Sequence, residues 1–487
     1  MKKIFSIIVF AIMLFGCSES FLDRQPEDSL APGIFFNNPT DIKTGVIAVY
    51  KPLQTIFDAG RLPFILAQMS DDGTKAFSQV VQHTFYKNNN NSESGLWNTF
   101  YKMIVNANNI IDIIDKYEPK NGSEATVVNA YRGETVFLRA FAYFNLVRLY
   151  GDVPMVVERF NDPSTAFGFG RTPVNEIFTK EIIPDLEYAF ANCYKMGDAA
   201  IAGEGARATK GAALTILAKV YLTMNDHANA ALTLKKLIVD KAAGNYGLLA
   251  DFSQIWLPTN KFNSESIFEI NYNVAAGTPS YYLRNMNIEA AWMYNCTKHN
   301  TYFVVEKNLM DEFVAYQEKT RYLTVDSVYS PNNLLIQPCP LKLMPPLIEC
   351  KTYDLTGTDY NYMVTRYADA LLMYAEALMV LGQKDQAAIY VNQVRARVNM
   401  VPITAADLNI DRILHERRME LAFEGHRYFD LVRTGKAIEY ISAVLMSDND
   451  YEGRIFRSEP IPEYQLILPI PVAEIEKDQT LTQNPGY

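Results

Sequence analysis

The chain has 487 residues, of which 49% are hydrophobic and 21% are charged. These proportions are ordinary for a packed globular protein and exclude disorder or a collagen-like repeat. The 45 Lys and Arg residues against 55 Asp and Glu residues give a formal net charge of −10. An acidic surface repels phosphate backbones and the sequence holds no basic stripe, so we expect no nucleic-acid partner.

The N-terminus has the pattern of an export signal. Two lysines precede an apolar run from Ile4 to Phe15 that only Ser6 interrupts. This run is too short to span a bilayer of about 30 Å, which takes about 20 residues, but it is typical of the apolar part of a secretory signal. The sequence therefore predicts a signal peptide over residues 1–16.

A cysteine follows this run at a distinctive position. Leu14-Phe15-Gly16-Cys17 is similar to a bacterial lipobox, which predicts cleavage before Cys17 and lipid attachment to it. The alternative is a plain secretory signal with an incidental cysteine. Several acyl chains anchor a protein firmly. We expect the polar, proline-broken stretch 17–40 to be a tether between the lipid and a single domain over 41–487.

Helical patterns dominate that domain. A helix that is apolar on nearly every face, as expected over 128–150, is one buried between neighbours. Two helix–turn–helix units, 207–239 and 363–398, share a pair of alanines in the second helix and resemble tetratricopeptide pairs, although they are not in tandem. Further helices are expected over 409–424 and 426–444, with Gly425 and Gly435 as helix breaks. The predicted fold class is mostly α, with tetratricopeptide-like helix pairs forming a scaffold and a loop-rich insertion carrying short strands.

Three segments lack this periodicity, namely 56–95, 161–175 and 245–360. They contain Gly, Pro, Asn, Ser and aromatic residues in short runs. Long irregular stretches in a compact protein are usually functional loops with short strands. We therefore expect ligand-binding regions at about 56–95 and 245–360.

Catalytic and metal-binding motifs are missing from the sequence. It contains no GxSxG, HExxH or phosphate-binding GxxxxGK motif, and its five histidines have no paired ligand spacing. We therefore expect no enzyme activity, no metal site and no cofactor. Cys339 and Cys350 are close enough in sequence to pair in a proline-rich loop, but both could equally be free.

Three glutamates, Glu416, Glu420 and Glu424, fall at i, i+4 and i+8, so a helix would place them on one face. A glycosidase needs paired carboxylates, and a lipid-anchored hydrolase using this stripe is one hypothesis. We favour an ion-pair network that clamps two helices, because arginines lie within a turn of the glutamates. These arginines are Arg417, Arg418 and Arg427.

Aromatic residues in or beside the irregular segments form a second constellation. Sugar rings stack their apolar C–H faces on aromatic planes, while their hydroxyls bind short polar side chains. Any single one of these aromatics could be a core residue, but together they favour a saccharide site. The candidate glycan-binding residues are Asp72, Trp97, Tyr282, Arg284, Trp292, Tyr294 and Asn295.

Several motifs resemble the SusD/RagB nutrient-binding lipoproteins of the Bacteroidetes outer membrane, over nearly the whole chain. Phe21-Leu22-Asp23 after Cys17 is similar to the start of the mature family members. The other matching stretches are Trp97-x3-Tyr101-x2-Ile104-x3-Asn108, Tyr143-Phe144-Asn145-Leu146, Tyr150-Gly151-Asp152-Val153-Pro154, Glu416-Arg417-Arg418-x-Glu420-Leu421, Glu424-Gly425-x-Arg427-x2-Asp430-Leu431-x-Arg433-x-Gly435, Leu468-Pro469-Ile470-Pro471 and the final Gln483-Asn484-Pro485-Gly486-Tyr487.

This resemblance implies a lipid-anchored, surface-exposed outer-membrane protein that captures oligosaccharides or polysaccharides. It implies delivery of the glycan to a SusC-like TonB-dependent transporter, without cleavage. The resemblance implies that Trp97 is a binding residue, because Trp97 lies in a motif that matches the family. The alternatives are a peptide-binding member of the same family, a helical-repeat scaffold protein and the lipid-anchored glycoside hydrolase.

Overall fold

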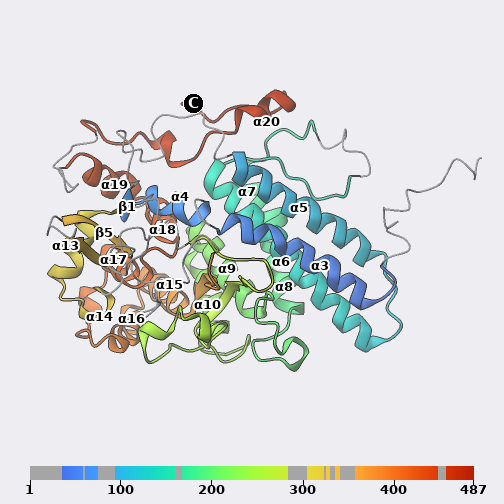
Figure 1. The fold of residues 1–487 in the computed structure, drawn as a ribbon, viewed down its shortest axis with the longest axis horizontal. Coiled ribbons are helices and arrows are strands. Elements are labelled where there is room, and N and C mark those ends of the chain that lie inside the picture. The colour runs from blue at the N-terminus through green and yellow to red at the C-terminus, as the bar shows by residue number, and fades with distance from the viewer. Residues whose placement is uncertain are drawn as a thin grey trace, which may run out of the picture.

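The computed structural model describes residues 36–58, 61–74, 94–160, 167–282, 304–322, 325–329, 335–340, 357–447 and 457–487. Helices make up most of this part of the chain (Figure 1), which confirms the predicted fold class. The α-helices are α3 (Pro39–Ile56), α4 (Leu62–Gln68), α5 (Ser94–Asp115), α6 (Gly122–Tyr150), α7 (Val174–Ile177), α8 (Ile183–Asn192), α9 (Lys210–Thr223), α10 (His227–Ile238), α13 (Lys307–Ala315), α14 (Lys319–Tyr322), α15 (Tyr367–Val380), α16 (Lys384–Arg397), α17 (Ile410–Leu421), α18 (Arg427–Arg433), α19 (Ala437–Leu445) and α20 (Val472–Lys477).

Short strands accompany the helices in three antiparallel pairs. The pairs are β1 with β3, β2 with β6, and β4 with β5. The strands are β1 (Gly73–Thr74), β2 (Ser266–Ile270), β3 (Val304–Val305), β4 (Val325–Tyr329), β5 (Leu335–Pro340) and β6 (Tyr362–Arg366). No helix within the described ranges is long and apolar enough to cross a membrane.

The predicted long helix is α6, and it is buried on all sides from Val128 onward apart from a few residues. It begins earlier than the apolar pattern, because the Asn121 side chain accepts a hydrogen bond from the Glu124 N–H and caps the helix at 3.0 Å. Helices α3, α5 and α8 pack around it. Figure 1 shows α3, α5 and α6 together at one end of the molecule, with α13, α14 and α19 at the other.

The two predicted helix–turn–helix units are α9 with α10 and α15 with α16. Helix α10 also packs against α15, so the two units form one continuous helical layer. Small residues lie at these contacts: Ala218, Ala230, Ala375 and Ala387 are all fully buried. Alanine at a crossing lets two helix backbones approach closely, which is why the alanine pairs predicted these units correctly.

The predicted helix 363–381 begins later than the sequence pattern indicated. Residues Tyr362–Arg366 instead form β6, paired with β2, and α15 starts only at Tyr367. Val364 and Thr365 are β-branched and fit a buried strand, and the backbone of Arg366 is extended (φ −138°, ψ 170°). This correction matters because it directs the Arg366 side chain toward the carboxylates described below.

The C-terminal helices are broken at Gly425 and Gly435 as expected, although the first of them ends before Glu424. Helix α17 ends at Leu421, and the left-handed backbone of Phe423 (φ 65°) and Gly425 (φ 76°) turns the chain. Glu424 is therefore not on the helix. The predicted helix 426–444 is divided into α18 and α19 at Gly435 (φ 70°), where glycine tolerates the left-handed conformation that ends a helix.

Candidate functional site

The two regions expected to carry ligand loops meet in the β1–β3 ladder. Gly73 pairs with Val305 and Thr74 pairs with Val304. The N–H of Glu306 also donates to the carbonyl oxygen of Asp72 at 2.9 Å. Residues 70–74 precede the stretch 75–93, and residues 304–312 follow the stretch 283–303. We call residues 70–74 and 304–312 together the loop base.

Arg418 of α17 fastens both halves of the loop base to the helical scaffold. Its Nε donates to Asp72 Oδ1 at 2.7 Å, and its Nη2 donates to the carbonyl oxygen of Asp71 at 2.5 Å. Its Nη1 donates to Glu312 Oε2 of α13 at 2.6 Å. The guanidinium is buried, so three charge-assisted bonds act where water does not compete.

A second arginine completes the anchoring of this segment. Arg427 Nε and Nη2 donate to the two carboxylate oxygens of Asp71, both at 2.7 Å. Burial alone would raise the pKa of Asp71, but Arg418 and Arg427 outweigh it and hold that pKa well below its usual range. Asp72 differs, because burial and the neighbouring Asp71 charge raise its pKa in spite of Arg418. The pair of aspartates thus has a structural partner for each carboxylate.

The glutamates of the 416–424 stripe form the predicted ion-pair network. Glu416 accepts from Arg321 Nη1 at 2.6 Å and from Arg395 Nη1 at 2.6 Å. Glu424 accepts from Arg366 Nε at 2.7 Å, and Glu420 accepts from Arg366 Nη1 at 2.7 Å. All these side chains are buried. The ion-pair interpretation is confirmed.

The partners differ from those the sequence suggested. The glutamates pair with arginines of α14, β6 and α16, whereas the neighbouring Arg417 binds Asp369 and Asp430. The reason is helical geometry: successive residues differ by about 100°, so Arg417 and Arg418 point away from the face of Glu416 and Glu420. The arginines that reach that face come from distant parts of the chain.

This environment is unsuitable for glycoside hydrolysis. Glu416 and Glu420 have fully buried side chains held by guanidinium groups, so neither reaches a glycosidic oxygen. Burial would raise the pKa of Glu416, but Arg321 and Arg395 lower it below its usual value. A general acid needs a raised pKa and access to substrate. The geometry gives the stripe a scaffolding role.

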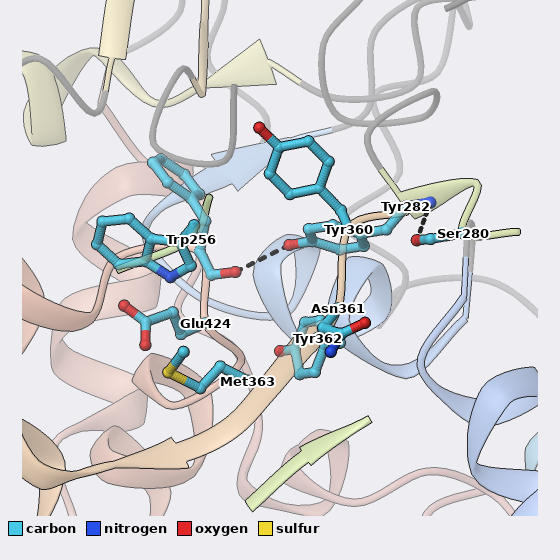
Figure 2. Close-up of a pocket in the computed structure, with 9 residues that line it drawn as sticks. Trp256, Ser280, Tyr282, Tyr360, Asn361, Tyr362, Met363 and Glu424 are labelled. Carbon is cyan, nitrogen blue, oxygen red and sulfur yellow. Dashed lines mark hydrogen bonds between the residues drawn. The ribbon is translucent and has the colours of Figure 1, made fainter. Parts of the chain in front are cut away.

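Tyr282 ends the described chain before residue 283 and is part of a buried aromatic cluster. Its hydroxyl donates to the carbonyl oxygen of Phe423 at 2.8 Å, and its ring meets Tyr362 edge-on at 5.4 Å between centroids. Burial raises its pKa. With Trp256 and Tyr360, these rings line a cavity of about 10 Å³ (Figure 2), room for about one water and far too small for a sugar.

Trp97, near the start of α5, lies in the core. Its side chain is 4% exposed, and its ring lies 5.0 Å from that of Tyr101 and 5.1 Å from that of Tyr150. The indole is therefore packed on aromatic neighbours in the described structure. Asp72, Trp97 and Tyr282 all lie at the ends of the expected ligand loops and anchor them, so a direct part in binding stays a prediction for each.

The other candidates lie outside the described residues. These are Arg284, Trp292, Tyr294 and Asn295, together with Cys17 and the predicted signal peptide and tether up to residue 35. Cys350 is also outside, so its pairing with Cys339 stays a prediction. Cys193 is a buried free thiol. Among the residues that the structure describes, no three His, Cys, Asp or Glu side chains are arranged to hold a metal ion.

The sequence analysis missed several residues of this assembly. Arg366, Arg395 and Arg397 gave no local signal, because each contacts carboxylates from a different element, and Arg321 joins Glu416 in addition to its neighbour Glu318. The contact between Arg418 and Asp72 joins positions 346 residues apart. A motif search sees spacing along the chain, so contacts of this kind are invisible to it.

Two family descriptions match the chain. Residues 342–487 match the "SusD family", and residues 20–222 match the family described as "Starch-binding associating with outer membrane". Among characterised relatives, SusD-like protein P2 of Formosa agariphila is 28% identical, with all of both chains covered. The starch-binding protein SusD of Bacteroides thetaiotaomicron is 28% identical over 27% of this chain.

Solved structures agree with these matches. A laminarin-binding SusD-like protein is 27% identical and superposes with a TM-score of 0.75, covering 93% of this chain and 100% of its own. Surface glycan-binding protein A from Bacteroides thetaiotaomicron, solved in complex with laminarihexaose, shares the fold at a TM-score of 0.73 and 22% identity, over 91% of this chain and 99% of its own. The two family matches, the SusD-like relatives and the shared fold together support this chain as a SusD-like family member.

Proposed function

We propose that this protein is a cell-surface lipoprotein that captures glycans and delivers them to a SusC-like TonB-dependent outer-membrane transporter. The observation that carries the proposal is the loop base. It brings the ends of the stretches 75–93 and 283–303 together on a rigid support. The names of the similar proteins, which bind laminarin or starch, support a glycan as the ligand.

In this proposal the residues that contact sugar lie on the second stretch and, for Asp72, Trp97 and Tyr282, beside the ends of the two stretches. Trp292 and Tyr294 supply stacking faces, while Arg284 and Asn295 bind hydroxyl groups. Affinities on the order of micromolar to millimolar are enough for capture, because a polysaccharide offers many repeats for binding and the transporter then takes up the bound glycan.

Affinity electrophoresis in gels containing laminarin or starch tests glycan binding. We expect Trp292→Ala to abolish retention in the gel that retards the unaltered protein. Trp256→Phe is the matched control, because this tryptophan packs on Phe252 at 4.9 Å within the described core. Equal retention of both variants would contradict the assignment of Trp292.

The transporter partnership needs a separate measurement. We expect an affinity-tagged protein to copurify with a TonB-dependent transporter from detergent-solubilised outer membranes. Copurification without retention on any glycan or peptide would favour a purely scaffolding role. Glycan cleavage by the purified protein would contradict a binding role without catalysis.

Membrane attachment is assigned to Cys17. We expect Cys17→Ser to move the protein from the outer-membrane fraction to the soluble fraction, while protease added to intact cells degrades the unaltered protein. A Cys17→Ser variant that stays in the membrane fraction would show that the lipid is not the anchor.

A further inference from the structure

A second candidate site lies in a cleft between α13 and α19, beside the loop base. Its volume is about 550 Å³, comparable to the pockets that hold small ligands. Both helices lie at the same end of the molecule as β1 (Figure 1). The residues on which the argument depends are Asn308, Asp311, Glu312, Tyr316, Glu439 and Tyr440.

Two tyrosines face this cleft with their rings held in place. Tyr316 is 42% exposed, and its ring packs at a tilt of 38° against His415 with 4.0 Å between centroids. Tyr440 is partly exposed; its hydroxyl donates to Asp411 at 3.2 Å and its ring lies 5.2 Å from the Arg427 guanidinium. A ring fixed by its neighbours loses little entropy when a ligand stacks on the remaining surface.

Carboxylates at the rim provide hydrogen-bond acceptors for hydroxyl groups. Asp311 and Glu439 have side chains that are 61% and 66% exposed, each paired with a lysine of its own neighbourhood. A carboxylate has about four acceptor positions, so one lysine leaves capacity for a ligand. Glu312 is fixed more firmly, by His415 and by Arg418.

The charge of the lining selects among saccharides. Asp311, Glu312 and Glu439 face the cleft with Arg418 as the cation, and Arg418 is also bound to Asp72. Lys307 pairs with Asp311, Lys436 with Glu439 and Arg418 with Glu312, so each of these cations already binds a carboxylate and offers little attraction to a uronate or sulfate group. Aromatic faces combined with acceptor oxygens match a neutral polyhydroxylated ring.

We propose that the α13–α19 cleft is a second saccharide subsite that binds neutral glycan chains. This inference rests on the proposed function and extends it. Glu312 belongs to the loop base and also lines the cleft, and Arg418 joins it to Asp72, so the two sites adjoin. A polysaccharide occupies both sites at once, whereas a short oligosaccharide occupies one.

The double variant Tyr316→Ala/Tyr440→Ala tests this subsite, with laminarin and laminarihexaose as probes. Losing two stacking faces is expected to weaken laminarin binding about tenfold, which corresponds to about 1.4 kcal/mol. Laminarihexaose binding through the loops is expected to change less than twofold. Tyr117→Ala, which changes a partly exposed tyrosine just after α5, is the control.

Hydrogen exchange gives an independent measurement on the unaltered protein. We expect laminarin to slow exchange in peptides covering 307–316 and 437–447. Laminarin binding that is unchanged in the double variant, or absent protection in both peptides, overturns this inference alone. Failure of laminarin and starch to retard the unaltered protein contradicts the proposed function as well.

Discussion

Replacing Arg418 by methionine tests whether one buried arginine holds the ligand loops. Methionine keeps much of the length but leaves Asp72 and Glu312 without the donors that lie at 2.7 and 2.6 Å. Breaking a buried ion pair by removing one partner costs about 3–5 kcal/mol. We therefore expect the free energy of unfolding to fall by about 4 kcal/mol.

This loss converts into a measurable shift in Tm. An unfolding entropy of about 2.1 cal/mol/K per residue gives about 1 kcal/mol/K for a chain of 487 residues. Arg418→Met should thus lower Tm by about 4 °C in differential scanning calorimetry. We also expect faster hydrogen exchange in peptides covering 70–74 and 304–312, because the loop base loses its attachment to α17.

Arg132→Met is the matched control for this substitution. Arg132 Nε binds Asp115 at 2.8 Å, but the two side chains are 26% and 50% exposed, so we expect a loss of at most about 1 kcal/mol. A Tm for Arg418→Met no lower than that of Arg132→Met would refute the reasoning. So would unchanged hydrogen exchange at the loop base.

The acid dependence of stability provides a further check on the same arginine. Burial alone would raise the pKa of Glu312, but His415 and Arg418 lower it to about 2 from an ordinary value of 4.5. Because the folded pKa is the lower one, this contribution is complete above pH 4.5 and is lost as pH falls toward 2. Arg418→Met should show a shallower loss of stability across that interval.

Three other substitutions have clear expected outcomes. Burial lowers the pKa of His426 to about 3. The free energy of unfolding should therefore fall by about 1.4 kcal/mol for each pH unit between about pH 6.5 and 3. Urea titrations of His426→Gln should lack this contribution. Gly425→Ala should cost about 1–2 kcal/mol more than Gly435→Ala, because only at Gly425 would the new Cβ lie within 2.9 Å of the Tyr362 hydroxyl; equal Tm values would contradict this. Trp97→Ala should cost about 3–5 kcal/mol by calorimetry, and a loss below 1 kcal/mol would argue against its core position.

The helical scaffold was predictable because its signals are local. Alanine pairs, apolar periodicity and capping residues lie within a few positions of the elements they specify, as at Asn121 for α6. The predicted helix boundaries were wrong where tertiary contacts compete with helix propensity. Residues 362–366 pair with β2 because the hydrogen bonds of the strand pair and the ion pairs of Arg366 stabilise this segment more than another helical turn would.

The candidate site was likewise predictable only in part. The sequence correctly marked an ion-pair network around Glu416 and Glu420, since clustered charge is visible along the chain, whereas the ligand-binding role of the loop regions stays a prediction. It did not separate residues that stack on a ligand from residues that pack in the core. Trp97 and Tyr282 are residue types that are typical of sugar-binding sites, but their burial against Tyr101 and Tyr362 decides their role in the fold.

By itself the sequence determined the class of this protein, its mostly helical architecture and its acidic surface, because periodicity, motifs and net charge are properties of the linear chain. Only the tertiary structure decided which arginine meets which carboxylate, that the two loop regions share one base, and that a cleft opens between α13 and α19. Such contacts join residues hundreds of positions apart. Their energies depend on distance and burial in the folded molecule, which no local pattern encodes.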